Sequence, residues 1–274
     1  MGPSDNGAST SVRVQSGLEA VLAAADHLVL AGRWDSADRL LATTMADQPE
    51  AHARLAIARA AVAVDRDLWL GTKTADDGLA AAELACADVE DLALQWDLDL
   101  LRLRCRYTAT LFSSQHEASA VSPLVEEAAR LRRTAPDVRR SGWATFWHGV
   151  IADNLAHERA LARECYDEAL RLAEVDGDDL LLSYALRHLG DHVLEDDSDI
   201  ALAGTYWERS TTLRQRLGFV PGALAQQLLL ATHAQRAGDP TKARVIAEAV
   251  GRWAAALGVE WLAAQARGVL GERA

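Results

Sequence analysis

The chain has 274 residues, of which half are apolar and a quarter charged, a composition typical of a folded globular protein and unlike that of a disordered chain. Its 40 acidic and 28 basic residues give a net charge of −12, which works against binding to the phosphate backbone of nucleic acids. No stretch reaches the ~18 uninterrupted apolar residues of a membrane helix. We therefore expect neither a direct nucleic-acid partner nor a membrane partner.

The first predicted element is an N-terminal tail. Residues 1–17 are rich in Gly, Ser and Asp, and they contain neither an early cationic region nor an apolar run. This composition predicts a disordered tail and no secretory signal, so we expect a cytoplasmic protein.

From residue 18 to residue 272 the sequence predicts helices throughout. Apolar residues recur at steps of three and four, and no convincing alternating pattern of a strand interrupts them. The predicted helices span residues 18–31, 35–47, 50–66, 76–87, 89–113, 123–134, 138–156, 159–174, 178–195, 199–216, 221–237, 240–257 and 259–272.

The breaks between these helices carry the expected residues. Four glycines stand where a helix end needs a left-handed residue: Gly32, Gly218, Gly238 and Gly258. Three prolines are placed to begin helices, two of them after a residue that can cap the helix: Pro123 after Ser122, Pro221, and Pro240 after Asp239.

A repeated pattern runs through the helices. The turn at residues 32–37 holds Trp34 and, three positions later, Ala37; Leu41 and Pro49 follow. The same frame of small, large and small residues returns as Ala162, Tyr166 and Ala169, and again as Ala203, Trp207 and Ser210. The frame resembles the tetratricopeptide repeat, although it recurs here at about 40 residues and the family's shortest period is about 34. After Gly190 the turn looks about one residue longer than in the family.

This resemblance implies an all-α fold, an α-solenoid of about six antiparallel helix pairs plus a C-terminal capping helix, with a concave groove. The match is poor between residues 66 and 123, where Trp69 and Phe112 fit no position of the repeat.

A narrower resemblance lies in residues 185–190 and 213–218, which are similar to the helical sensor arms of large actinobacterial transcription regulators. The chain lacks a phosphate-binding glycine-rich loop and a basic helix-turn-helix, so ATPase and DNA-binding activity cannot be transferred to it.

The resemblance also suggests groove residues, because five positions of each first helix line the groove in the tetratricopeptide family. Trp147 and Tyr184 would supply contact area, Arg187 would bind a carboxylate and Asp191 would accept from an amine. The alternative is that these side chains are ordinary solvated residues or contacts between repeats. The candidate binding residues are Trp147, Asn154, Tyr184, Arg187, Asp191, Gln235 and Arg236.

Three histidines are candidates for a metal site. His148 and His188 fall at the same predicted position of successive first helices, and His192 lies one helical turn after His188. Two imidazoles at that spacing can bind one metal, with Asp191 or His148 as a third ligand. Packing between stacked helices and acid–base catalysis are the other interpretations.

Three functions follow as hypotheses. The first is a scaffold or regulatory adaptor that binds a protein or peptide in its groove, without a cofactor and without catalysis. The second is a ligand-sensing regulator fragment that binds a small molecule. The third is an enzyme that uses the histidine-lined groove around His148, His188, Asp191 and His192. Because fold alone does not fix function, the three stay open at this point.

Overall fold

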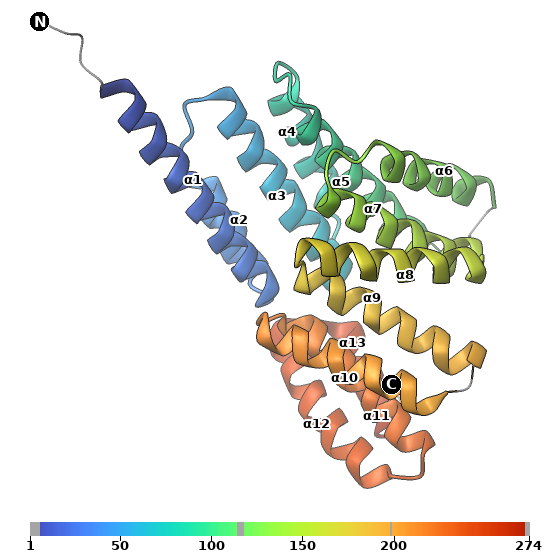
Figure 1. Ribbon diagram of the computed structural model, residues 1–274. Helices are drawn as coiled ribbons and strands as arrows, with labels where there is room; N and C mark the ends of the chain where they lie inside the picture. The colour runs from blue at the N-terminus through green and yellow to red at the C-terminus, as the bar shows by residue number, and fades with distance from the viewer. Residues whose placement is uncertain (1–5, 114–117, 198, 272–274) are drawn as a thin grey trace, which may run out of the picture.

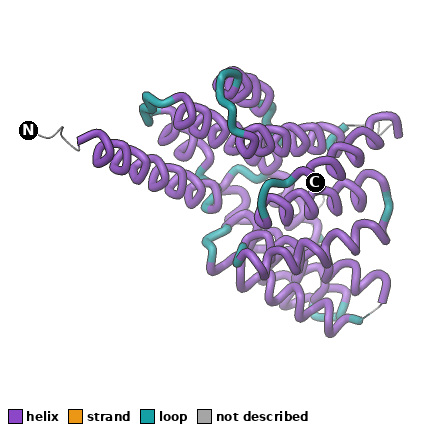
Figure 2. The backbone as a smooth tube through the Cα atoms, turned by 45° about the horizontal axis from the view of Figure 1, so that its top comes forward, coloured by secondary structure: helices purple, strands orange, loops and turns teal. Residues whose placement is uncertain are grey.

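The computed structural model describes residues 6–113, 118–197 and 199–271, and this part of the chain is all helical (Figures 1 and 2). Residues 1–5 of the predicted tail and residue 272 lie outside the described residues. The helices are α1 (Asn6–Leu30), α2 (Trp34–Ala42), α3 (Pro49–Leu70), α4 (Ala75–Cys86), α5 (Leu92–Leu111), α6 (Ala118–Thr134), α7 (Val138–Ile151), α8 (Arg159–Asp176), α9 (Asp179–His192), α10 (Ile200–Arg216), α11 (Val220–Arg236), α12 (Pro240–Leu257) and α13 (Glu260–Val269).

These helices form the predicted solenoid. Helices that follow each other in the sequence pack against each other, which gives six antiparallel pairs from α1–α2 to α11–α12, and α13 covers the last pair. Small residues let the paired helices approach, since the Ala162 and Ala203 side chains are fully buried. The predicted fold class is confirmed. None of the helices in the described part of the chain combines the length and the hydropathy of a membrane-spanning segment.

The predicted helix ends are mostly confirmed. The four glycines adopt positive φ angles between 68° and 83°, the region that favours glycine. Asp239 caps α12 by accepting a hydrogen bond from the backbone N–H of Lys242 at 2.9 Å. The prediction that a helix begins at Pro123 after a Ser122 cap is wrong: α6 begins at Ala118, because buried Val121 extends its apolar face and a proline near the start of a helix removes few hydrogen bonds. Helix α1 already begins at Asn6.

Two first helices end in a π-helical turn, η1 (Ala152–Ala156) after α7 and η2 (Val193–Asp197) after α9. Consecutive first helices α7, α9 and α11 start 41 residues apart. The second helices α10 and α12 start only 40 residues apart, because no π turn follows the first helix between them, α11. A π turn adds one residue to a helix, and this explains the longer turn predicted after Gly190.

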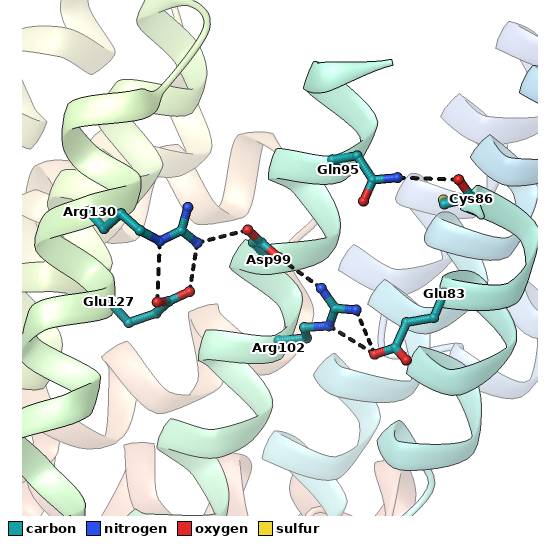
Figure 3. A network of polar contacts seen from close by, with 7 residues as sticks. All are labelled: Glu83, Cys86, Gln95, Asp99, Arg102, Glu127 and Arg130. Carbon is teal, nitrogen blue, oxygen red and sulfur yellow. Dashed lines mark hydrogen bonds and ion pairs between the residues drawn. The ribbon is translucent and has the colours of Figure 1, made fainter. Parts of the chain in front are cut away.

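Ion pairs on the surface join α4, α5 and α6, in the region where the repeat pattern is weak (Figure 3). Arg102 of α5 binds Glu83 of α4 at 2.7 Å and Asp99 of its own helix at 2.8 Å. Asp99 also accepts from Arg130 of α6 at 2.7 Å, and Arg130 binds Glu127. Exposed pairs contribute little singly, but a chain of them orients three helices relative to one another.

The two ends of the solenoid pack against each other. Residues of α1 to α3 and of α11 to α13 share one apolar core, and Figure 1 shows the lower ends of the blue N-terminal helices against the orange and red C-terminal ones. We call this junction the seam. A solenoid normally makes contacts only between neighbouring repeats, so the seam turns an open array into a closed one.

Aromatic rings form the most specific part of the seam. Trp69, near the end of α3, stacks on Trp261 of α13 with ring centroids 5.8 Å apart. The Trp261 indole N–H donates to the backbone oxygen of Trp69 at 3.1 Å. Phe219, in the turn before α11, meets the Trp69 ring edge-on at 5.9 Å. Trp69 fits no repeat position, and its ring partners lie in the distant helix α13 and in the turn before α11.

Candidate functional site

The inner face of the solenoid contains a cavity made of two adjoining pockets. The first, which we call the aromatic pocket, has a volume of about 400 Å³. Four successive first helices and the turn η1 line it, which places it on the concave face. Its lining residues are Asp65 and Leu68 of α3, Leu100, Arg104 and Tyr107 of α5, Trp143, Phe146, Trp147 and Val150 of α7, Asn154 of η1, and Leu180, Tyr184 and His188 of α9.

The second, which we call the charged pocket, has a volume of about 490 Å³ and shares Leu100 and Trp143 with the first. Its side chains come from α1, α3, α5 and α7, so α1 faces α5 and α7 across the cavity. Arg54 pairs with Glu19 at 2.7 Å, and Arg140 binds both oxygens of Asp97 at 2.7 Å. The remaining lining residues are Leu22, Ala23, Asp26, Trp96 and Arg139. The cavity is therefore elongated, with a charged end and an aromatic end.

The aromatic pocket is built around Phe146, a buried residue of α7. Its ring lies 5.4 Å from that of Tyr184, 5.8 Å from that of Trp147 and 6.0 Å from that of Trp143, measured between centroids. Two of these contacts are edge-to-face, a geometry that aromatic pairs prefer, and the one with Tyr184 is tilted. Interlocked rings of this kind hold one another in place, so the wall is preorganised for an apolar group.

Two arginines lie against the rings of this wall. The Arg104 guanidinium lies 5.1 Å from the Trp147 ring centroid and also pairs with Asp65 of α3. The buried Arg214 of α10 lies 5.0 Å from the Tyr184 ring and donates to the backbone oxygen of Gly222 at 2.8 Å. Burial lowers the pKa of Arg214 to about 10, so it stays charged at neutral pH. Cation–π contacts of this kind stabilise both charge and ring position.

His188 lines the aromatic pocket as a neutral side chain. Its ring stacks on Tyr166 of α8 with centroids 4.6 Å apart. Burial, followed by the charge of the neighbouring Arg187, lowers the pKa of His188 to about 3. A neutral imidazole in this wall adds an apolar face and no charge near pH 7.

Behind the wall, Asp153 of η1 holds a buried polar network. Its Oδ2 accepts from the Tyr166 hydroxyl at 3.2 Å and from His192 Nε2 at 3.1 Å. Burial alone would raise the pKa of Asp153, but the hydrogen bond from His192 and the Tyr166 hydroxyl bring it below its ordinary value. Asp153 is therefore an anion that ties η1 to α8 and α9.

The structure brings three of the predicted binding residues together in the aromatic pocket: Trp147, Asn154 and Tyr184. Trp147 is largely buried, with 7% of its surface exposed, so it presents little of its surface to the cavity. The Asn154 amide donates to the Tyr107 hydroxyl at 2.7 Å.

Arg187 and Asp191 lie elsewhere, at the contact between α9 and α10. They pair with each other, and Trp207 of α10 donates to the Asp191 carboxylate at 3.2 Å. The 41-residue step between α7 and α9 explains this, because it makes His188 the counterpart of Trp147 and shifts the cavity-facing positions by one residue from those predicted.

The other candidates are dispersed. Gln235 and Arg236 are exposed near the end of α11 and line none of the pockets described above. His148 is buried, and burial followed by the charge of Arg132 lowers its pKa. Both His188 and His192 contact the Tyr166 ring. The described residues hold no group of three His, Cys, Asp or Glu side chains placed to bind a metal.

Sequence reasoning missed Arg104, Tyr107 and Phe146. Arg104 and Tyr107 come from α5, in the region of weak repeat pattern, so no repeat position pointed to them. Phe146 directly precedes Trp147, and this aromatic pair is the one sequence feature that could have indicated Phe146 as a residue of the site.

No protein-family model matches the chain, and no curated protein sequence matches it.

Proposed function

We propose that the protein binds a partner molecule in the cavity on its inner face, and that the partner is an extended segment of a peptide or protein. The observation that carries this proposal is the aromatic pocket, to which four successive first helices contribute side chains. Pockets with mostly apolar and aromatic walls and a few placed polar groups are typical binding sites. The tetratricopeptide-like pattern supports the same use of the concave face, in a scaffold or regulatory adaptor.

The shape of the cavity favours an extended segment over a folded domain. Helix α1 faces α5 and α7 across the charged pocket, and the seam joins the two ends of the solenoid. A chain in extended conformation matches an elongated space of this kind better than a globular surface does. Its side chains would meet ion pairs at one end of the cavity and aromatic rings at the other.

A second candidate is a sensor of a small apolar molecule. The volume of the aromatic pocket, about 400 Å³, falls in the range of small-molecule sites. The similarity of residues 185–190 and 213–218 to sensor arms supports the same function. In this case the charged pocket would stay unused.

Blocking the aromatic pocket tests both candidates. Leu180 lines the pocket and is partly exposed, so Leu180→Arg fills it without emptying the core. Leu92→Arg is the matched control, because Leu92 is 87% exposed and lines neither pocket. We would screen a peptide array and a small-molecule library against the wild type, measuring binding and the melting temperature, and repeat every hit with both variants.

We expect hits to bind the wild type and Leu92→Arg but not Leu180→Arg. The class of the hits distinguishes the peptide function from the small-molecule function. Hits that bind Leu180→Arg as well as the wild type would refute the aromatic pocket as the binding site.

A further inference from the structure

The seam is connected to the aromatic pocket through a row of aromatic rings. Tyr184 lines the pocket, and its ring lies 5.7 Å from Phe219. Phe219 contacts Trp69, and Trp69 stacks on Trp261. Four side chains in contact therefore lead from the pocket wall to α13. Each contact is between residues that lie far apart in the sequence or in different repeats.

The pocket has walls on both sides of the seam. Leu68 of α3 lines the pocket directly before Trp69, which belongs to the N-terminal side. Tyr184 packs on Arg214, near the end of α10, and on Phe219 in the turn that follows, both on the C-terminal side. Any separation of the seam changes the distance between these two walls.

The seam consists mainly of side-chain contacts at the ends of helices. A methyl group on Gly32 would lie 3.2 Å from Pro221 and 3.3 Å from Leu257, so the turn after α1 lies directly against the start of α11 and the end of α12. Trp261 keeps 38% of its surface exposed. Separating the seam breaks the hydrogen bond from Trp261 to Trp69 and no hydrogen bond inside a helix, so it can open while the helix pairs stay folded.

We propose that the seam is a clasp that regulates the aromatic pocket, and that the two open and close as one unit. The inference rests on the proposed function in one respect: a molecule bound between the α3 and α9 walls touches both only when the seam is closed, so its binding favours closure. By linkage, a variant that lowers the closed fraction of the seam weakens binding in proportion to that fraction, although Trp261 does not line the pocket.

Hydrogen exchange of the ligand-free protein tests the clasp. Trp261→Ala removes the stack and the hydrogen bond, and we expect amide exchange to rise about tenfold in residues 65–70 of α3 and 180–188 of α9. Trp253→Ala is the matched control, because Trp253 of α12 is 60% exposed and has no ring contact with the seam. An increase confined to α12 and α13, or the same increase in Trp253→Ala, would overturn the proposal.

If Trp261→Ala does not fold, Trp261→Phe keeps a ring but loses the N–H donor. We then expect a smaller rise, about threefold, in the same segments. An unchanged exchange rate in α3 and α9 would again contradict the clasp.

A binding measurement separates the clasp from the proposed function. We would titrate 2-naphthol, a neutral aromatic probe, into the wild type, Trp261→Ala and Leu180→Arg. Weaker binding by both variants supports both proposals. Equal binding by the wild type and Trp261→Ala, with loss in Leu180→Arg, keeps the binding function and overturns the clasp. If Leu180→Arg binds the probe as well as the wild type does, the probe does not bind in the aromatic pocket. The hydrogen-exchange measurement alone then tests the clasp.

Discussion

The α7–α8 and α9–α10 pairs repeat the same backbone at a distance of 41 residues. Asp137 and Asp178 cap the first helices of the two pairs. Gly149 and Gly190 let the following helix approach, and Tyr166 and Trp207 are the rings that pack there.

The two pairs differ in the residues that face the cavity. Trp147 in the first pair corresponds to His188 in the second, and both line the aromatic pocket. The comparison indicates that the buried frame determines the backbone, whereas the cavity-facing positions accept different chemistry. Changes in the frame should therefore act on both pairs in the same direction, by amounts that depend on the local packing, whereas changes in pH should act on them differently.

The largest expected effect comes from Gly190→Ala. The new methyl group would lie 2.4 Å from the Trp207 Nε1 atom, and Trp207 is almost fully buried. We expect overpacking to cost about 3 kcal/mol and the better helix propensity of alanine to return about 1 kcal/mol, so that the free energy of unfolding falls by about 2 kcal/mol. Urea denaturation measures the change.

Two further variants complete this test. At Gly149 the nearest atoms to a new methyl group are 3.0 Å away, in Cys165 and Tyr166, so Gly149→Ala should cost less than 1 kcal/mol net. At Gly204 of α10 nothing lies within 4 Å, so Gly204→Ala should be neutral or stabilising. Equal losses at Gly149 and Gly190 would contradict the difference in packing between the two pairs.

A smaller loss is expected for Asp153→Asn, which weakens the link between the pairs. The folded-state pKa of Asp153 is lowered, so the stability that its anionic form contributes is present above the pKa of the unfolded chain, ~3.9, and is lost as the pH falls through the lower folded value. At pH 7 we expect a loss of about 1.5 kcal/mol. The deficit should shrink below pH ~4; a deficit that is the same at pH 3 and pH 7 would exclude the charge as its cause.

The third prediction concerns His188 of α9, whose counterpart in α7, Trp147, does not titrate. The unfolded chain binds a proton at His188 below pH ~6.5, whereas the folded protein binds it only near pH 3. The stability is therefore fully present above ~6.5 and falls as the pH drops. We expect His188 to account for about 1.5 kcal/mol of the loss between pH 6.5 and pH 5.

His188→Gln should flatten the pH dependence of the melting temperature in this range. Buried His148 also has a lowered pKa, so part of the slope should remain. If His188→Gln leaves the slope unchanged, His188 is not held neutral by its surroundings.

The smallest effect is expected where the frames differ by one hydroxyl. Ser210 of α10 donates to the backbone oxygen of Ser183 at 2.6 Å, whereas the corresponding Ala169 of α8 has no donor. Ser210→Ala should cost about 0.5 kcal/mol, because the Ser183 carbonyl keeps its helical partner. Chemical denaturation, with Ala169→Ser as the reciprocal variant, measures it.

Local patterns predicted most of the fold. Glycines with positive φ and the small residues at Ala162 and Ala203 act on adjacent helices, so their effect can be read from short stretches of sequence. The seam could not be predicted in this way, because Trp69 and Trp261 meet through the closure of the whole solenoid.

The candidate site was predicted only in part. Trp147, Asn154 and Tyr184 lie in helices with a clear repeat pattern, and the structure places them in one pocket. The positions of Arg187 and Asp191 depended on a register that the π turns change by one residue. Arg104 lies where the pattern is weak, and its place in the cavity follows from the superhelical curvature.

The hydrogen bond from Trp261 to Trp69 joins residues 192 positions apart in the sequence. Contacts over such a distance close a long loop, which slows folding. During synthesis, α3 leaves the ribosome long before α13, so the apolar surface around Trp69 stays uncovered until α13 has been made. Each newly made molecule therefore passes through a stage in which most repeats are present and this surface is still uncovered, and in that stage it is most open to aggregation or to capture by a chaperone.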